Sequence, residues 1–144
     1  MRRLRLALMV SLCALGATLA AGPAFAKPIS CLSASDVAKA TGFAAASLQP
    51  MNMGIKVICL YNGSGGQLEV TYAVGQPFNT FTMGEHATPG AKALNGIGDG
   101  AFATTAGTQV TVNAIVKGKA EFVITSTVSL AKTEVLAKKI VASL

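Results

Sequence analysis

The sequence predicts a single α+β domain, in which an antiparallel sheet of about five strands packs one face against a short N-terminal helix and a C-terminal amphipathic helix. Three observations lead to this prediction. An apolar leader stands apart from the rest of the chain, several short segments alternate between apolar and polar residues, and the C-terminus carries an apolar stripe at helical spacing. Without the leader, 118 of the 144 residues remain, enough for one hydrophobic core and too few for two.

The first 26 residues have the layout of a secretory signal peptide. Three arginines within the first five residues precede an apolar run at 6–21, a Gly-Pro pair ends the run, and Ala24-Phe25-Ala26 supplies the small residues of a cleavage site. The run is shorter than the about 20 residues of a spanning helix, and an uncleaved anchor is the alternative. We expect cleavage after Ala26, no stable membrane span afterwards, and a secreted, periplasmic or cell-envelope location for residues 27–144.

Removal of the leader changes the charge and the cysteine count. The full chain has a formal net charge of +6, whereas residues 27–144 hold nine Lys, four Glu, two Asp and no Arg, and so carry +3. Arginine supplies the bidentate contacts to phosphate and guanine, so we expect no nucleic-acid partner. The two remaining cysteines, Cys31 and Cys59, favour one disulfide in an exported domain, worth roughly 3.5 kcal/mol in the chain-entropy model. A metal pair, or a thiol nucleophile with His86, is the competing interpretation.

The first half of residues 27–144 predicts a helix followed by a hairpin. Ser33, with Asp36 three residues later, offers a capping box for a short helix that Thr41-Gly42 would end. Residues 43–54 are interpreted as a connector. Strands are expected at Ile55–Tyr61 and Leu68–Val74, because the latter alternates with a period of two and a glycine-rich loop joins them.

The second half predicts three more strands, at Ala101–Thr105, Gln109–Val116 and Ala120–Val128, with Lys117-Gly118 as a two-residue turn. Ser129 can cap a final helix over residues 130–143, whose apolar arc should pack on the sheet. The other face of the sheet would then be wet or would bind a partner. Between the two halves, Gln76–Gly98 is irregular, with room for one helical turn at Phe78–Met83, and a loop of this length is where we expect a site.

The order of these features resembles a family of small secreted and lipoprotein domains of unknown function in mycobacteria and related actinobacteria. The shared pattern begins with an early cysteine, here Cys31, before a Ser-x-x-Asp-Val helix, here Ser33–Val37, that a glycine follows, here Gly42. A second cysteine within a strand, here Cys59, a Gly-x-Gly-Asp-x-Ala turn, here Gly96–Ala101, and a C-terminal amphipathic helix complete it. The resemblance implies a single disulfide and an envelope location, with no generally established activity. This chain departs from the family in lacking the lipoprotein cysteine and in having Gly100 where an acid is usual.

Catalytic chemistry finds little support in the sequence. The segment Gly96–Gly100 has the spacing of a phosphate-binding loop, but it lacks a following helix and a lysine, so we interpret it as a turn with positive φ angles. Glu85, His86 and Asp99 could converge into an acid–base group, which leaves an enzyme of unrecognised type as an alternative. No cofactor is expected.

Four residues outside the predicted helices and strands suggest an alternative function, copper binding. Met51, Met53, Met83 and His86 supply thioether and imidazole groups, which suit copper(I), although such methionines also fill gaps in cores. The main hypothesis is a non-enzymatic exported binding or accessory protein whose partner is an envelope protein or a small apolar ligand. A copper-binding protein is the second hypothesis.

Overall fold

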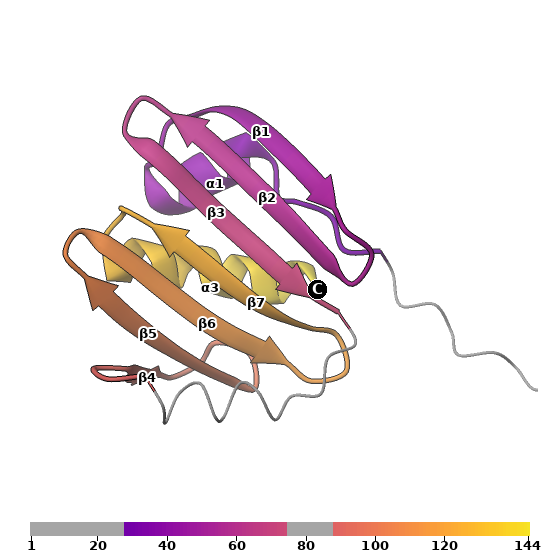
Figure 1. Cartoon of the computed structure of the whole chain (residues 1–144), viewed down its shortest axis with the longest axis vertical. Coiled ribbons are helices and arrows are strands. Elements are labelled where there is room, and N and C mark those ends of the chain that lie inside the picture. Colours follow the sequence, from indigo (N-terminus) through magenta and orange to yellow (C-terminus); the bar gives the residue numbers. More distant parts are fainter. Residues whose placement is uncertain (1–27, 75–87) are drawn as a thin grey trace, which may run out of the picture.

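The computed structural model describes residues 28–74 and 88–144, which form two layers, a seven-stranded antiparallel sheet and a pair of helices on one of its faces (Figure 1). The expected signal peptide and the helical turn expected at Phe78–Met83 lie outside the described residues. The strand order is β1-β2-β3-β7-β6-β5-β4. The elements are α1 (Ala34–Thr41), β1 (Ala45–Asn52), β2 (Lys56–Gly63), β3 (Gly66–Ala73), β4 (Lys92–Leu94), β5 (Gly100–Ala106), β6 (Gln109–Val116), β7 (Ala120–Ser126) and α3 (Leu130–Ser143).

The α+β class and the antiparallel sheet are as predicted, but the expected number of about five strands was wrong. The two additional strands, β1 and β4, are the two edges of the sheet. β1 lies inside the segment 43–54 that we interpreted as a connector, and β4 lies inside the irregular segment 76–98. Neither strand shows a clear alternation of buried and exposed residues.

Pro50 lies within β1, where its position explains why a strand can contain it. The backbone N–H of Met53 donates to the carbonyl of Lys56 over 2.8 Å. Since donors alternate along an antiparallel strand, Met51 also faces β2, and the nitrogen of Pro50 faces the free edge. Proline is confined to such edge positions because it has no N–H to donate, and here it also interrupts the free edge against pairing with other chains.

Helix α1 is capped by Ser33 at its N-terminus and by Gly42 at its C-terminus. The Ser33 hydroxyl accepts from the backbone N–H of Asp36 at 3.1 Å and donates to the Asp36 carboxylate at 2.7 Å. Gly42 adopts φ 71°, the left-handed conformation that glycine takes readily, and its N–H donates to Ala38. Asp36 also forms a 2.9 Å ion pair with Lys139 of α3, so one carboxylate both caps α1 and joins the two helices.

The core lies between the helices and the inner face of the sheet. Tyr61, Tyr72 and Phe122 are the largest fully buried side chains, and α3 buries Leu136 and Ile140 against them. One buried polar link holds α3 to β7: the hydroxyls of Ser126 and Thr133 are 3.1 Å apart, and the Thr133 hydroxyl also lies 3.1 Å from the Ser129 carbonyl. Because Thr133 has a single proton to donate, Ser126 is the donor when Thr133 donates to Ser129.

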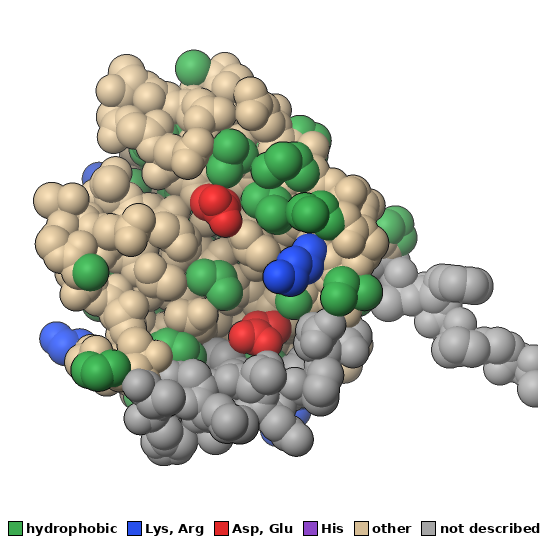
Figure 2. Space-filling model, in the orientation of Figure 1, with side chains coloured by type: hydrophobic (Ala, Val, Ile, Leu, Met, Phe, Trp, Pro, Cys, Tyr) green, Lys and Arg blue, Asp and Glu red, His purple; other side chains and the backbone are tan. Residues whose placement is uncertain are grey.

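Neither of the described helices, α1 and α3, lies over the outer face of the sheet, and the described part of this face mixes apolar and polar side chains (Figure 2). Its register places one residue from each strand in a row that crosses the whole sheet: Met51, Ile58, Thr71, Val123, Asn113, Phe102 and Ala93. Hydrophobic side chains gather at the β1–β2 end of this face, where Ile58 and Leu60 are half-buried. Towards β5, Phe102 and Ile115 form a second buried cluster with Ala91 beside them.

Candidate functional site

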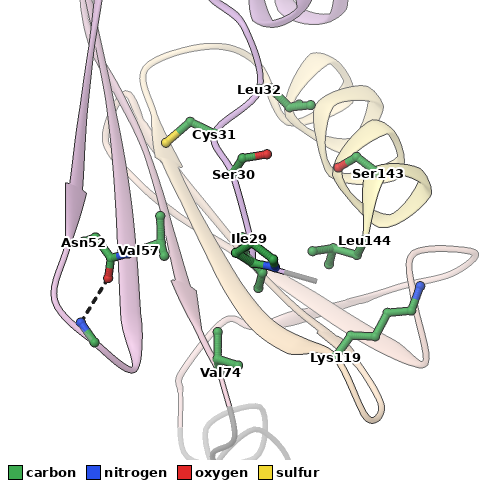
Figure 3. Close-up of a pocket in the computed structure, with 12 residues that line it drawn as sticks. Ile29, Ser30, Cys31, Leu32, Asn52, Val57, Val74, Lys119, Ser143 and Leu144 are labelled. Atoms are coloured by element: carbon green, nitrogen blue, oxygen red, sulfur yellow. Dashed lines mark hydrogen bonds between the residues drawn. The ribbon is translucent and has the colours of Figure 1, made fainter. Parts of the chain in front are cut away.

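A pocket of about 420 Å³ opens on the helix side of the sheet, at one end of the strands (Figure 3). Three parts of the chain enclose it: the segment 28–32 before α1, the strand ends around the β1–β2 and β6–β7 turns, and the last residues of α3. Most of the side chains are apolar. The described residues that line it are Pro28, Ile29, Ser30, Cys31, Leu32, Asn52, Gly54, Val57, Val74, Lys119, Ser143 and Leu144.

The pocket follows from a mismatch between the lengths of α1 and the strands. Helix α1 has eight residues and spans about 12 Å, because a helix rises 1.5 Å per residue. Strand β2 also has eight residues but spans about 27 Å at 3.4 Å per residue. The inner face near Val57 is therefore covered by the extended segment 28–32 instead of a helix. An extended chain is thinner than a helix, so space remains between this segment, Val74 and the end of α3.

A disulfide fastens the wall of the pocket to the sheet. Cys31 and Cys59 are bonded, with their Cα atoms 5.6 Å apart, which confirms the predicted pairing. Cys59 is fully buried in the middle of β2, so its side chain holds the segment 28–32 directly over the inner face. Because both sulfurs are in the bond, neither cysteine is available as the thiol nucleophile or metal ligand that we had left open.

A hydrogen bond attaches the next residue of this segment, Leu32, to the same strand. The Tyr61 hydroxyl donates to the carbonyl of Leu32 at 2.8 Å, and Tyr61 is two residues from Cys59 on the same face of β2. Burial first, and the negative charge of Asp36 second, raise the pKa of Tyr61 to about 12. Burial also raises the pKa of Tyr72, with Tyr61 adding to the shift. Both phenols thus stay neutral at ordinary pH.

The polar groups around the pocket differ in what they can offer a ligand. The Asn52 side-chain carbonyl accepts from the N–H of Gly54 at 3.1 Å, which leaves its amide N–H groups as donors. The Ser143 hydroxyl donates to the Ile140 carbonyl at 2.7 Å, so its oxygen can only accept. Among the described lining residues, Lys119 is the only one with a charged side chain.

Lys119 lies in the turn between β6 and β7. The register pairs Val116 with Ala120, so the turn has three residues, 117–119, instead of the two that we predicted. Gly118 takes the positive φ of 72° that this turn requires. The N–H of Lys119 donates to Val116 over 3.0 Å and closes the turn.

The glycine-rich segment before β5 is hydrogen-bonded to residues at the β6–β7 turn. The Asp99 carboxylate accepts from the N–H of Lys117 at 2.8 Å, and the N–H of Asp99 donates to the carbonyl of Ile115 at 2.8 Å. Gly96 and Gly98 have φ angles of 73° and 57°, as expected for a turn. The segment that resembles a phosphate-binding loop in sequence is therefore a brace for the β6–β7 turn, with its carboxylate already engaged.

The sites that we suspected from the sequence depend largely on residues outside the described part of the chain. Met51 and Met53 are 43% and 65% exposed on β1 and the turn after it. Met83, Glu85 and His86 lie outside the described residues, as does most of the segment 76–98 in which we expected a site. Within residues 28–74 and 88–144, no group of three or more His, Cys, Asp or Glu side chains could hold a metal ion. The described end of that segment, residues 88–98, contributes nothing to the lining of the pocket.

Sequence reasoning missed the pocket because its lining comes from five separate stretches of chain, none of which carries a motif. The one signal that could have drawn attention to Lys119 was its place after a tight turn, between two strands with buried alternate residues. Nothing in the sequence shows that this turn lies beside the end of α3.

Neither described helix is long and apolar enough to cross a membrane. Comparison of the chain with known protein families, curated proteins and solved structures found no match.

Proposed function

We propose that this protein is an exported, non-enzymatic binding domain that holds a small, largely apolar molecule in the pocket beneath residues 28–32. The observation that carries the proposal is the pocket itself. Its volume of about 420 Å³ lies within the roughly 300–1,000 Å³ of small-molecule sites, and such sites are mostly apolar with a few polar groups. Between the two partner classes expected from the sequence, this feature favours a small ligand over an envelope protein.

The attachment of the pocket wall supports binding in a preformed site. The wall is tied to β2 by the Cys31–Cys59 bond and by the hydrogen bond from Tyr61 to Leu32. A wall held in this way loses little conformational freedom when a ligand enters, so less of the interaction energy is spent on ordering. The disulfide is also compatible with an oxidising compartment outside the cytoplasm, where the leader would direct the chain.

The chemistry of the lining supports binding over catalysis. General acid–base catalysis uses two groups of suitable pKa, and nucleophilic catalysis uses a nucleophile beside a base. The described lining offers a single ionisable side chain, Lys119, while Cys31 is held in the disulfide. An apolar floor with one cation at its side is suited to holding a molecule and lacks a partner for proton transfer.

Titration of the purified, disulfide-bonded protein with a neutral fluorescent apolar probe, Nile red, tests the proposal. We expect saturable binding with one probe per chain. Val74→Trp should abolish binding, because Val74 lines the pocket and a large indole would fill it. The matched control is Val135→Trp, since Val135 is 52% exposed on α3 and does not line the pocket. The proposal fails if the parent protein binds no probe, or if Val74→Trp binds as well as the control.

A further inference from the structure

We propose that the pocket selects a single-chain amphiphile with one anionic group, and that Lys119 recognises this group while the apolar chain lies along the floor. This inference rests on the proposed function, since it names the class of small apolar molecule that the pocket takes. It is carried by the charge of the lining, by the way the β6–β7 turn is held, and by the arrangement of apolar residues beside Lys119.

Lys119 is the only charged side chain among the described lining residues, and no ion pair within the described part of the chain includes it. The acids nearest to it in the chain are directed elsewhere. Glu121 is on the outer face of β7, in register with Ala73 and Ile115, and the Asp99 carboxylate accepts from the N–H of Lys117. Leu144, the last residue of the sequence, lines the pocket but forms no ion pair with Lys119 in the described structure. The positive charge of Lys119 is therefore available to a ligand.

The backbone of the β6–β7 turn is held by three hydrogen bonds, from Lys119 to Val116, from Lys117 to Asp99 and from Asp99 to Ile115. These bonds fix where the lysine stem leaves the sheet. Figure 3 shows the stem beneath Leu144, with the ammonium directed away from Ile29 and Val74. Lysine commonly lays its methylene groups along apolar surface while its charge stays in water, so the stem continues the apolar lining and the ammonium marks the polar end.

Ile29, Leu144 and Val74 lie between Lys119 and the far side of the pocket, where Asn52 offers neutral amide donors (Figure 3). The volume of about 420 Å³ is sufficient for a small molecule with a single alkyl chain and one head group. The single cation in the described lining matches a head group with one negative charge.

The test compares two probes that share a ten-carbon chain, decanoate and decan-1-ol, each below its aggregation concentration. Each displaces Nile red from the purified, disulfide-bonded protein and from two variants. Lys119→Met removes the charge and keeps an unbranched apolar stem. Lys117→Met is the matched control, because Lys117 lies in the same turn, does not line the pocket, and contributes to the turn through its backbone N–H.

We expect decanoate to bind roughly five- to tenfold more tightly than decan-1-ol in the parent protein and in Lys117→Met. Lys119→Met should bind both probes equally, with the affinity for decan-1-ol unchanged. The preference for decanoate should also weaken as salt is added, since salt screens an exposed ion pair.

Three outcomes overturn the inference. Equal binding of the two probes by the parent protein shows that charge is not recognised. A preference that survives in Lys119→Met assigns recognition to another group, and a preference lost equally in Lys117→Met assigns it to the general positive field of the turn. If neither probe displaces Nile red because the parent protein binds no Nile red, the proposed function itself fails, which distinguishes the two results.

Discussion

The hydroxyl of Tyr61 donates a 2.8 Å hydrogen bond to the carbonyl of Leu32, next to the point where Cys31 is bonded to Cys59. Two consecutive residues of the wall segment are thus attached to two inward-facing positions of β2. The disulfide fixes the chain covalently, and the phenol satisfies a carbonyl that would otherwise face the protein interior. The pocket and the stability of the domain therefore depend on the same pair of attachments.

Removal of the disulfide should destabilise the domain and open the pocket together. For the double variant Cys31→Ala, Cys59→Ala we expect the free energy of unfolding to fall by roughly 3.5 kcal/mol, because the unfolded chain loses a loop of 28 positions. Nile red affinity should fall in the same variant, since the segment 28–32 is no longer held over Val57. Denaturant unfolding and probe titration measure the two effects. Chemical reduction of the parent protein is the control, and a reduced protein of unchanged stability would contradict the prediction.

Alkaline pH should destabilise the domain through its two tyrosines. The pKa of Tyr61 is raised to about 12, and that of Tyr72 is raised as well, whereas an exposed tyrosine ionises near 10. Since the folded pKa lies above the unfolded one, the stabilisation is complete below pH about 10 and is lost as the pH rises towards the folded value. The free energy of unfolding should therefore decline from pH about 10 to about 12.

Spectrophotometric titration of tyrosinate provides the measurement, because Tyr61 and Tyr72 are the only tyrosines in the chain. At pH 10 we expect almost no ionisation in the folded protein and about half ionisation in denaturant, where the pKa of each tyrosine is near 10. In Tyr61→Phe, Tyr72 should be the only source of the tyrosinate signal. The free energy of unfolding of this variant should fall by about 1 kcal/mol, because the hydrogen bond to Leu32 is lost. Ionisation of either phenol near pH 10 in the folded protein would contradict this prediction.

The stability of the domain should be sensitive to the addition of a single methyl group at Gly98, in the segment that is hydrogen-bonded to the β6–β7 turn. A Cβ at this position would meet the carbonyl of Ile115, and its φ of +57° strains any L-residue. Gly107 has a similar φ of +60° but open space around it, so it provides the control. We expect Gly107→Ala to cost about 1 kcal/mol and Gly98→Ala about 2–4 kcal/mol, measured by denaturant unfolding. Equal losses would show that the close approach to Ile115 is unimportant.

The leader should be removed at one site. We expect the exported protein to begin at Lys27, which intact mass spectrometry of the secreted material reads directly. Ala26→Glu should block processing, because the cleavage site requires a small residue at that position. Phe25→Leu changes the neighbouring position, which tolerates large residues, and should be processed normally. Retention of residues 1–26 in the mature material would show that the leader acts as an anchor.

The success of local prediction followed the strength of the local signal. Gln109–Val116 and the helix at 130–143 have the predicted boundaries, because period-two and helical patterns need no knowledge of neighbours. β1 was missed because Pro50 argues against a strand unless the strand is known to lie at an edge. β4 was missed because three residues are too few to show any period.

The sequence by itself predicted the α+β class, the pairing of Cys31 with Cys59, and the turn character of Gly96–Gly100, because each depends on local spacing, on composition or on the two cysteines that follow the leader. Only the tertiary structure decided the seven-strand order, the edge position of β1 and the pocket beside Lys119. These depend on which surfaces stay uncovered once an eight-residue helix packs on much longer strands, and that difference in length appears only when distant segments are brought together.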